Sequence, residues 1–365
     1  MRFMIMKKFA GLLTAAVLTA LTLTGCAGSE AAGSADATAE HPLVLNLAHN
    51  LAENHITSIA LQEFADNVEE KSGGRIQIRI FPNGTLGSET EVLEQLMAGV
   101  VDMTRVSAPG LATYNEGYHT FGLPYIFDDN ENYYKVMGSG QMGEFFRSSE
   151  ADGFVTLTYY TSGSRSFYTI DRPIRTPKDL NGLKVRVQDM KSQTDMMKAL
   201  GGTPVAMAMG DVYTALQTGI IDGTENNETA LTTGMHGEIC KFYSVDQHTM
   251  IPDVLVIATD TWEKLSEEDR QLLIDAAGES TKNHIGKWEQ AVAEAVDMPI
   301  VLYNIPARTG NALAPATVAK LSKIPNIVGA KDSSGNFDNM LQYIEQTRDS
   351  KDFAVLSGND SLILW

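Results

Sequence analysis

TPKDLNGLKVRV, residues 176–187, predicts a short capped turn that leads into a β-strand. Thr176 can cap the turn and Gly182 can end it, because hydroxyl side chains cap helical N-termini and glycine adopts the backbone angles that close a turn. Val185 and Val187 then lie on one face of the predicted strand, since successive side chains in a strand alternate between its faces. A turn followed by a half-buried strand is a unit of an α/β fold.

The same alternation places Lys184 and Arg186 on the opposite face of this strand. In a parallel sheet that is covered on both sides, a charge near the carboxyl end of a strand is stable only where it faces a crevice. Arg186 is therefore a candidate ligand for an anion. The alternative is an arginine on an edge strand in solvent, and the spacing alone does not separate the two.

Strands and helices also alternate in the N-terminal half of the chain. LVLNLAH (43–49) predicts a buried strand that opens a parallel sheet, and residues 56–68 carry apolar side chains at helical spacing. RIQIRIF (75–81) alternates as a second strand, and SETE (88–91) forms a capping box that starts a second helix. This order indicates an α/β layer.

Four segments, taken together and in this order, resemble the solute-binding proteins of tripartite ATP-independent periplasmic (TRAP) transporters. They are FPNGTLGSETEVLEQLMAGVVDM (81–103), FGLPYIFDD (121–129), GSRSFYTIDRPIRTPKDLNGLKVRVQ (163–188) and LGGTPVAMAMGDVYTALQTGIIDGTENN (200–227). The resemblance implies a two-lobed periplasmic solute-binding fold over residues 42–290, with lobe boundaries near residues 162 and 252. It implies a receptor that binds a small-molecule carboxylate, needs no cofactor, performs no chemistry and passes its solute to membrane subunits.

The resemblance also assigns ligand-binding residues. The carboxylate-binding arginine of these receptors corresponds to Arg186 in LKVRV, and a second arginine near the ligand corresponds to Arg165 in GSRSF. Asn226 corresponds to the asparagine of a DGxEN motif, and Met209 to a residue that lines the pocket. A guanidinium suits this role because its planar fork donates two parallel hydrogen bonds to a carboxylate.

The segment after the DGxEN motif points to a class of solute. Many relatives have proline there, whereas this chain has Asn227. The ENN form resembles receptors for sugar acids such as hexuronates, and Glu225, Asn226 and Asn227 carry the donors and acceptors that ring hydroxyls need. A polar surface loop is the alternative, and C4-dicarboxylates, sialic acid and other carboxylates remain open.

The last 75 residues resemble a different family. Three stretches are similar to dihydrodipicolinate synthase and its pyruvate-aldolase relatives, namely PIVLYNIPARTG (299–310), NIVGAKDSSG (326–335) and FAVLSGND (353–360). That resemblance implies a (β/α)8 barrel in which Lys331 forms a Schiff base, Tyr303 relays protons and Arg308 lies near the pocket mouth.

The length of this C-terminal part argues against an active lyase. A (β/α)8 barrel takes roughly 250 residues, and its site collects side chains from many strand ends. We interpret residues 291–365 as an incomplete barrel fragment in which Lys331 stays solvated, where an ammonium group is a poor nucleophile. Two segments joined near residue 290 explain the pattern. A Schiff-base lyase completed by a partner, and a nonfunctional chimera, are the alternatives.

The N-terminus predicts export. Lys7 and Lys8 precede an apolar run over residues 9–23, which is typical of a signal peptide spanning residues 1–25. LTGC resembles a bacterial lipobox, which implies lipidation of Cys26 and a tether over residues 26–41. We expect a periplasmic or extracytoplasmic protein held at the membrane by a lipid. The alternative is ordinary cleavage next to an incidental cysteine.

Composition narrows the remaining classes. The chain has 365 residues, 43% apolar content and a formal charge of -18, which favours two or more domains and argues against nucleic-acid binding. Cys240 is the one cysteine left after Cys26 and we expect it to be a buried small hydrophobe. The histidine spacings match no metal motif, so no metal site is predicted.

Overall fold

The computed structural model describes residues 36–295, 300–304, 306, 312–324 and 327–358. Within these ranges the predicted α/β class is confirmed, with strands and helices alternating from Leu43 to Ser357. The signal peptide, Cys26 and Arg308 lie outside the described residues. No helix among the described residues has the length and apolar character that crossing a membrane requires.

The first sheet has five strands in the order β2-β1-β3-β10-β4. The strands are β1 (Leu43–Ala48), β2 (Ile76–Phe81), β3 (Met103–Ser107), β4 (Phe154–Tyr160) and β10 (Asp253–Ala258). β1 pairs in parallel with β2 and β3, as the sequence predicts, whereas β10 runs antiparallel to β3 and β4. A strand from late in the chain therefore lies between two strands of the N-terminal part, β3 and β4.

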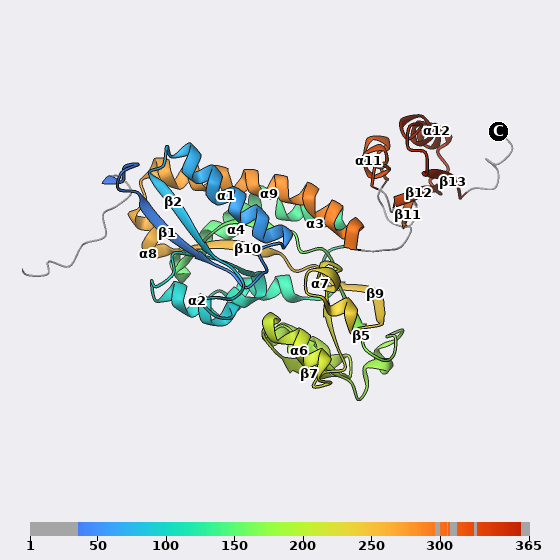
Figure 1. Ribbon diagram of the computed structural model, residues 1–365, viewed down its shortest axis with the longest axis horizontal. Helices are drawn as coiled ribbons and strands as arrows, with labels where there is room; N and C mark the ends of the chain where they lie inside the picture. Colours follow the sequence, from blue (N-terminus) through green and yellow to red (C-terminus); the bar gives the residue numbers. More distant parts are fainter. Residues whose placement is uncertain (1–35, 296–299, 305, 307–311, 325–326, 359–365) are drawn as a thin grey trace, which may run out of the picture. The chain divides into compact units, whose positions relative to one another are not determined.

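Helices cover both faces of this sheet. On one face α1 (Ile56–Lys71) and α9 (Glu267–Ala295) lie side by side and bury Phe64 and Leu273 (Figure 1). The other face packs against α2 (Glu89–Met97), α3 (Asn130–Met137), α4 (Gly140–Ser148) and the 3-10 helices η2 (Ala108–Thr113) and η3 (Glu116–Gly122). η4 (Ser149–Asp152) precedes β4, and α8 (Thr259–Lys264) follows β10.

Local signals in the sequence start and stop these helices. α2 begins at Ser88, whose side chain accepts from the Glu91 amide while the Glu91 carboxylate accepts from the Ser88 amide, so the predicted capping box is confirmed. α1 ends next to Gly73 and Gly74, which have φ angles of 63° and 81°. Glycine adopts these left-handed angles without the steric cost that other residues incur.

The second sheet has the order β7-β6-β8-β5-β9. Its strands are β5 (Arg165–Thr169), β6 (Lys184–Val187), β7 (Thr203–Ala206), β8 (Gly223–Asn226) and β9 (Phe242–Thr249). The helices associated with it are η5 (Pro177–Leu180), α5 (Lys191–Ala199), η6 (Met209–Asp211), α6 (Val212–Gln217), α7 (Thr229–Thr232) and η7 (His236–Glu238). The chain enters this sheet between β4 and β5 and returns to the first sheet between β9 and β10.

β6 shows the alternation that its sequence predicts. Val185 and Val187 are fully buried in an apolar cluster with Phe167 and Met197. Lys184 is exposed, but Arg186 is only 3% exposed. The edge-strand alternative for Arg186 is therefore wrong: β6 lies between β7 and β8, and the guanidinium is inside the fold.

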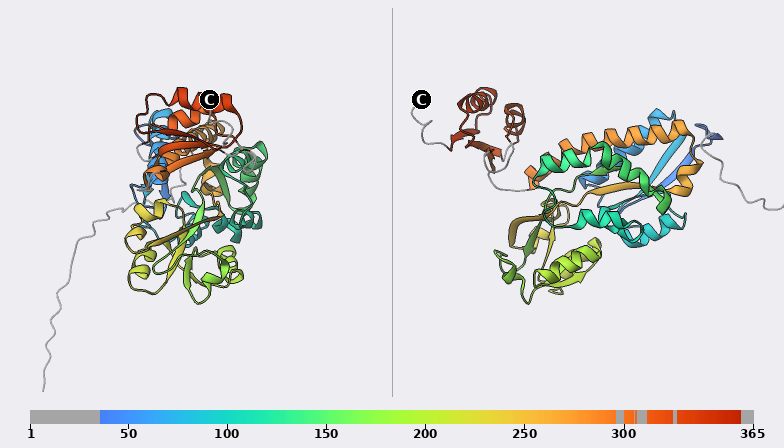
Figure 2. Two further views of the ribbon diagram at one scale, coloured as in Figure 1. Left: turned by 90° about the vertical axis from the view of Figure 1, so that its right-hand side faces the viewer. Right: turned by 180° about the vertical axis from the view of Figure 1, so that it is seen from behind.

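The C-terminal residues form a separate three-stranded sheet in the order β11-β12-β13, with parallel pairing throughout. Its elements are β11 (Ile300–Asn304), α11 (Pro315–Leu321), β12 (Ile327–Asp332), α12 (Phe337–Gln346) and β13 (Ala354–Ser357). Both helices pack on one face of the sheet through Val318 and Tyr343 (Figure 2). On the other face Val301, Tyr303 and Leu356 are 45–49% exposed.

Candidate ligand-binding cavity

A cavity of about 620 Å³ is lined by residues from both five-stranded sheets and the segments that follow their strands. Cavities of this size suit small-molecule ligands. Its lining includes charged and amide side chains from distant parts of the sequence, among them Asn50, Glu89, Arg105, Arg165, Arg186 and Asn226. Ligands of open α/β sheets bind next to the carboxyl ends of strands, which is where Arg186 and Asn226 lie in β6 and β8.

Arg186 brings a positive charge without a paired anion to this cavity. Its Nε and Nη2 donate to the carbonyl oxygen of Met207 at 3.0 and 2.8 Å, and no ion pair to it occurs among the described residues. Burial lowers the pKa of Arg186, Glu225 opposes this, and the charge of Arg165 adds to the lowering. Nη1 and the second hydrogen of Nη2 remain to bind an anion end-on.

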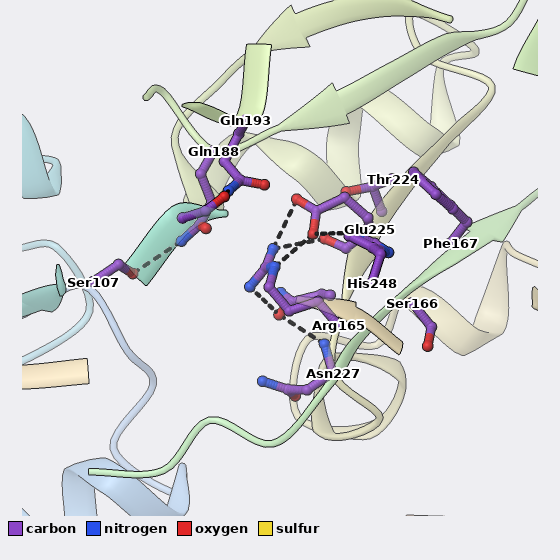
Figure 3. A network of polar contacts seen from close by, with 12 residues as sticks. Ser107, Arg165, Ser166, Phe167, Gln188, Gln193, Thr224, Glu225, Asn227 and His248 are labelled. Atoms are coloured by element: carbon purple, nitrogen blue, oxygen red, sulfur yellow. Dashed lines mark hydrogen bonds and ion pairs between the residues drawn. The ribbon is translucent and has the colours of Figure 1, made fainter. Parts of the chain in front are cut away.

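Arg165, by contrast, is neutralised within the protein. Its Nε donates to Glu225 Oε2 at 2.5 Å and its Nη2 to Oε1 at 2.9 Å (Figure 3). Its Nη1 donates to Asn226 Oδ1 at 2.8 Å. Burial by itself would raise the pKa of Glu225, but Arg165 and His248 hold it at about 2. The pair is therefore ionised at neutral pH, and Arg165 is fixed in place.

The prediction that Glu225 binds solute hydroxyls is wrong for this geometry. Glu225 is 0% exposed, is not part of the cavity wall and has both carboxylate oxygens bound by Arg165. Side chains alternate along β8, so Asn226 faces the cavity and Glu225, one residue earlier, does not. Its role in the structure is that of a buried counter-ion that orients Arg165.

His248 extends this ion pair into a network. Its Nε2 lies 3.5 Å from Glu225 Oε2, its Nδ1 lies 2.9 Å from Asp246 Oδ2, and its ring stacks on Phe167 with centroids 4.5 Å apart. Burial lowers the pKa of His248, but Asp246 and Glu225 outweigh it and raise the pKa overall. No sequence pattern predicts this contact, because the pairing of β5 with both β8 and β9 is what brings His248 close to Glu225.

Asn226, Asn227 and Met209 all line the cavity. Asn226 Oδ1 accepts from Arg165 and from the Asn227 amide, and Asn226 Nδ2 lies 3.8 Å from Met209 Sδ. Asn227 Oδ1 accepts from the amide and hydroxyl of Thr229. The oxygens of both amides are thus used inside the protein, and their Nδ2 groups are the part of each side chain that can donate to a solute.

The cavity wall also carries a second charged cluster, which no sequence motif predicts. Arg105 is 4% exposed and pairs with Glu89 at 2.7 Å and with Asp253, while its Nη1 also donates to Asn50 Oδ1 at 3.1 Å. Burial alone would lower the pKa of Arg105, but both carboxylates outweigh it and raise the pKa. Arg105 lies in the buried strand MTRVS, so the reasoning that selects Arg186 also selects it. Glu89 and Asp253 carry no comparable signal.

The two sheets are linked by polar contacts at the cavity. Gln188, next to the end of β6, donates to Ser107 Oγ at 2.9 Å (Figure 3). The Ser107 amide in turn donates to Glu89 Oε2 at 3.3 Å. Glu89 is therefore connected to the strand of Arg186 through two hydrogen bonds.

The predicted lyase residues of the C-terminal sheet lie on neighbouring strands. Tyr303 and Lys331 are register partners in β11 and β12, and Lys331 Nζ lies 4.5 Å from the centroid of the tyrosine ring. Ser333 Oγ donates to Tyr303 Oη at 3.3 Å. Tyr303 is 49% exposed, so the pair lies on the uncovered face of the three strands rather than inside a barrel. The described residues contain no cluster that could hold a metal ion.

Two family models match the chain. Residues 47–300 match the bacterial extracellular solute-binding protein, family 7, and residues 278–365 match the dihydrodipicolinate synthetase family. The ranges overlap over 278–300, which includes the junction predicted near residue 290.

The uncharacterized protein YiiZ of Salmonella typhimurium is 40% identical over 67% of this chain and 77% of its own length. The C4-dicarboxylate-binding periplasmic protein DctP of Rhodobacter capsulatus is 33% identical over 77% and 84%.

Solved structures support the match to the solute-binding protein family. A TRAP periplasmic solute-binding protein from Anaerococcus prevotii with bound α/β-D-glucuronate is 39% identical, with a TM-score of 0.67 over 69% of this chain and 82% of that one. A TRAP periplasmic solute-binding protein from Xanthobacter autotrophicus with bound β-D-galacturonate is 32% identical, with a TM-score of 0.67 over 69% and 84%. The predicted two-lobed receptor fold is confirmed, and the chain belongs to the bacterial extracellular solute-binding proteins of family 7.

Proposed function

We propose that this chain is the extracytoplasmic solute receptor of a TRAP-type transporter and that its solute is a sugar acid, a hexuronate in the first instance. The family match and the relatives solved with glucuronate and galacturonate support the proposal. In this role the protein binds and releases its solute unchanged and delivers it to membrane subunits.

The observation that carries the proposal is the state of Arg186. Its guanidinium is buried at the cavity wall, has no ion-pair partner among the described residues and keeps Nη1 free. A buried cation is costly unless an anion pairs with it. A solute carboxylate that binds end-on to Nη1 and Nη2 would supply that anion and fix the orientation of the solute.

The rest of the cavity suits a polyhydroxylated solute. Asn226 and Asn227 have Nδ2 donors, and Glu89 and Asp253 have carboxylate acceptors, on the wall of the same cavity. Hydroxyl groups both donate and accept, so they can bind to both kinds of partner. Arg165 supports this surface by fixing Asn226, because its own charge is already paired with Glu225.

The register of Tyr303 against Lys331 favours a second candidate function, a Schiff-base lyase. The relatives from Rhodobacter capsulatus and Anaerococcus prevotii, which match most of this chain, are named as binding proteins rather than enzymes. The two residues lie on an uncovered sheet face, whereas a carbonyl-activating lysine needs an enclosed pocket that lowers its basicity. We therefore propose that this pair is a remnant without activity.

We further propose that Cys26 carries a lipid that holds the receptor at the extracytoplasmic membrane surface. The sequence LTGC at residues 23–26 supports this proposal, and the Ser/Ala/Gly-rich residues 29–40 suit a flexible tether.

A panel of solutes tests the receptor function. The purified chain is heated with D-glucuronate, D-galacturonate, succinate or no addition, and the unfolding temperature is measured. A ligand that binds only the folded protein raises that temperature. We expect the uronates to raise it and succinate to raise it less. Equal shifts for all carboxylates, or no shift with either uronate, would contradict the proposed solute class.

A further inference from the structure

We propose that Glu89, held in place by Arg105, selects solutes with one carboxylate and rejects solutes with two. This inference deepens the proposed function and rests on it. The question is open because relatives at comparable identity include both a C4-dicarboxylate-binding protein and receptors solved with monocarboxylate sugars.

The buried charges around the cavity come close to balance without a solute. Arg165 is paired with Glu225, which leaves it no net charge to offer. Arg105 is paired with two carboxylates, Glu89 and Asp253, so this cluster carries one negative charge. Among the described arginines and lysines on the cavity wall, Arg186 is the one that no carboxylate pairs with. The cavity therefore has one attachment point for an anion and a negative cluster elsewhere on its wall.

Hydrogen bonds hold the Glu89 carboxylate in one orientation. Oε1 accepts from Arg105 Nη1 at 2.7 Å and from Ser107 Oγ at 3.4 Å, and Oε2 accepts from the Ser107 amide at 3.3 Å. A carboxylate has about four acceptor positions. One position remains, and the side chain is 16% exposed on the cavity wall, so a solute can reach it.

Glu89 and Arg186 act on the same solute from two different sheets. Glu89 is the first residue of α2, beside the first sheet, and Arg186 lies in β6 of the second. Both line the same cavity, and Gln188, which follows β6, donates to Ser107 Oγ at 2.9 Å while the Ser107 amide donates to Glu89 at 3.3 Å. A solute whose carboxylate binds Arg186 therefore lies within the field of Glu89.

The second functional group of the solute determines whether the solute is attracted to Glu89 or repelled by it. A hydroxyl can donate to the free acceptor position of Glu89 and is attracted. A second carboxylate has no hydrogen to donate and meets a fixed like charge in a poorly solvated cavity, where such repulsion is strong. Selectivity of this kind arises from a repulsive group that disfavours the wrong ligand, as well as from contacts with the right one.

Two open-chain sugar acids test this directly. D-Galactonate and galactarate differ only at C6, which is a hydroxymethyl group in one and a carboxylate in the other. Their dissociation constants are measured by calorimetry, or by displacement of D-glucuronate when binding is weak. We expect the wild-type protein to prefer galactonate by at least about tenfold, given the energy of two like charges across a few ångströms of protein. Glu89→Gln should reduce this ratio by about tenfold or let galactarate bind for the first time.

Two further variants make the result decisive. Asp253→Asn removes one charge from the other side of Arg105 and should move the ratio in the same direction, which keeps the test valid if Glu89→Gln does not fold. Glu70→Gln is the control, because Glu70 is an exposed carboxylate of α1 that does not line the cavity. An unchanged ratio in both test variants, or an equal change in Glu70→Gln, would overturn the inference. Absence of any D-glucuronate binding by the wild type would instead refute the proposed function.

Discussion

At the scale of single residues, three buried arginines line one cavity but have different partners. Arg186 donates only to a backbone carbonyl, Arg165 is paired with one carboxylate, and Arg105 with two. The cost of burying a charge is offset by pairing, so the arginine without a partner is the one whose energy a bound anion lowers most. The following predictions depend on this difference.

Arg186→Ala should abolish most of the binding energy for a uronate. Removing one partner of a buried ion pair costs roughly 3 to 5 kcal/mol, because the other charge stays buried without compensation. Arg186→Lys should recover only part of the loss, since an ammonium lacks the planar fork. Calorimetry with D-glucuronate measures both. Arg172→Ala, an exposed arginine of the same sheet region, is the control, and wild-type affinity in Arg186→Ala would refute the assignment.

Glu225→Gln should destabilise the protein in the absence of solute. The substitution leaves Arg165 buried without its counter-ion and removes one of the two carboxylates beside His248, at a cost of roughly 3 to 5 kcal/mol in the free energy of unfolding at pH 7. The folded pKa of Glu225 is about 2, below its ordinary value of 4.5, so its stabilising contribution is present above pH 4.5 and is lost as the pH falls toward 2.

Urea unfolding at pH 7 and pH 3 checks this prediction, with Glu238→Gln, an exposed carboxylate near the second sheet, as the control. The difference between wild type and Glu225→Gln should be smaller at pH 3. A difference that does not shrink at pH 3 would show that the Glu225 charge is not the stabilising feature.

Sequence patterns predict some of the residues at the cavity and not others, for physical reasons. Strand alternation in LKVRV indicates Arg186, and the resemblance of the DGxEN motif indicates Asn226. The prediction that Glu225 binds solute hydroxyls rests on its residue type alone. It ignores the alternation of side chains along the strand, which points Glu225 and Asn226 to opposite faces. Glu89 and Asp253 meet at Arg105 from 16 and 148 residues away, and no local pattern records such a contact.

At the scale of elements, α9 connects the N-terminal sheet to the region where the two family matches overlap. It continues without interruption from Glu267 to Ala295 and packs beside α1. His284 lies fully buried in this contact, where its Nε2 is 3.2 Å from Thr57 Oγ1 and its ring faces Tyr160. Burial lowers the pKa of His284 to about 3, with smaller contributions from Arg105 and Lys287.

His284 should make the protein less stable as the pH falls below about 6.5. Its folded pKa lies below its ordinary value, so only the unfolded chain takes up a proton in that range, and stability falls by up to about 1.4 kcal/mol per pH unit. His284→Asn should reduce this slope. Denaturant unfolding between pH 7 and pH 5 measures it, with the exposed His41→Asn as the control. Identical slopes for His284→Asn and wild type would contradict the burial of a neutral imidazole in α9.

Local elements were predicted more successfully than their order in the sheets. β1, β2, β6 and the capped start of α2 follow from alternation and capping residues. The place of β10 between β3 and β4 did not follow, because its antiparallel pairing with these strands joins segments about 100 to 150 residues apart. Such pairing depends on tertiary packing, which a pattern within one strand does not contain.

At the scale of the whole molecule, the chain carries one receptor fold and one three-stranded fragment. The fragment has parallel β11, β12 and β13 with helices on a single face. A complete barrel would bury the other face, where Val301, Tyr303 and Leu356 are exposed here. Both resemblances were recognisable from sequence because each rests on local motifs.

Incubation with pyruvate and borohydride should leave the protein mass unchanged. Borohydride traps an imine as a stable secondary amine, and Lys331 lacks the enclosed pocket that favours imine formation at neutral pH. Mass spectrometry of the intact protein reads the result, and Lys331→Ala identifies the site if an increment occurs. An increment in the wild type that Lys331→Ala abolishes would revive the lyase function.

Cys26→Ala should release the exported protein from the membrane. The acyl chains of the proposed lipid insert into the bilayer, and removing the cysteine thiol removes their point of attachment. Fractionation of cells that express the full chain measures the distribution between membrane and soluble extracts. Equal membrane association of wild type and Cys26→Ala would show that the anchoring proposal is wrong.

A crystal structure of the protein with bound D-glucuronate tests most directly the claim that Arg186 holds a sugar acid. The solute carboxylate should lie within hydrogen-bond distance of Arg186 Nη1 and Nη2, with ring hydroxyls toward Asn227 and Glu89. A carboxylate bound to Arg105 or Arg165 instead, or a solute outside the cavity, would contradict that claim.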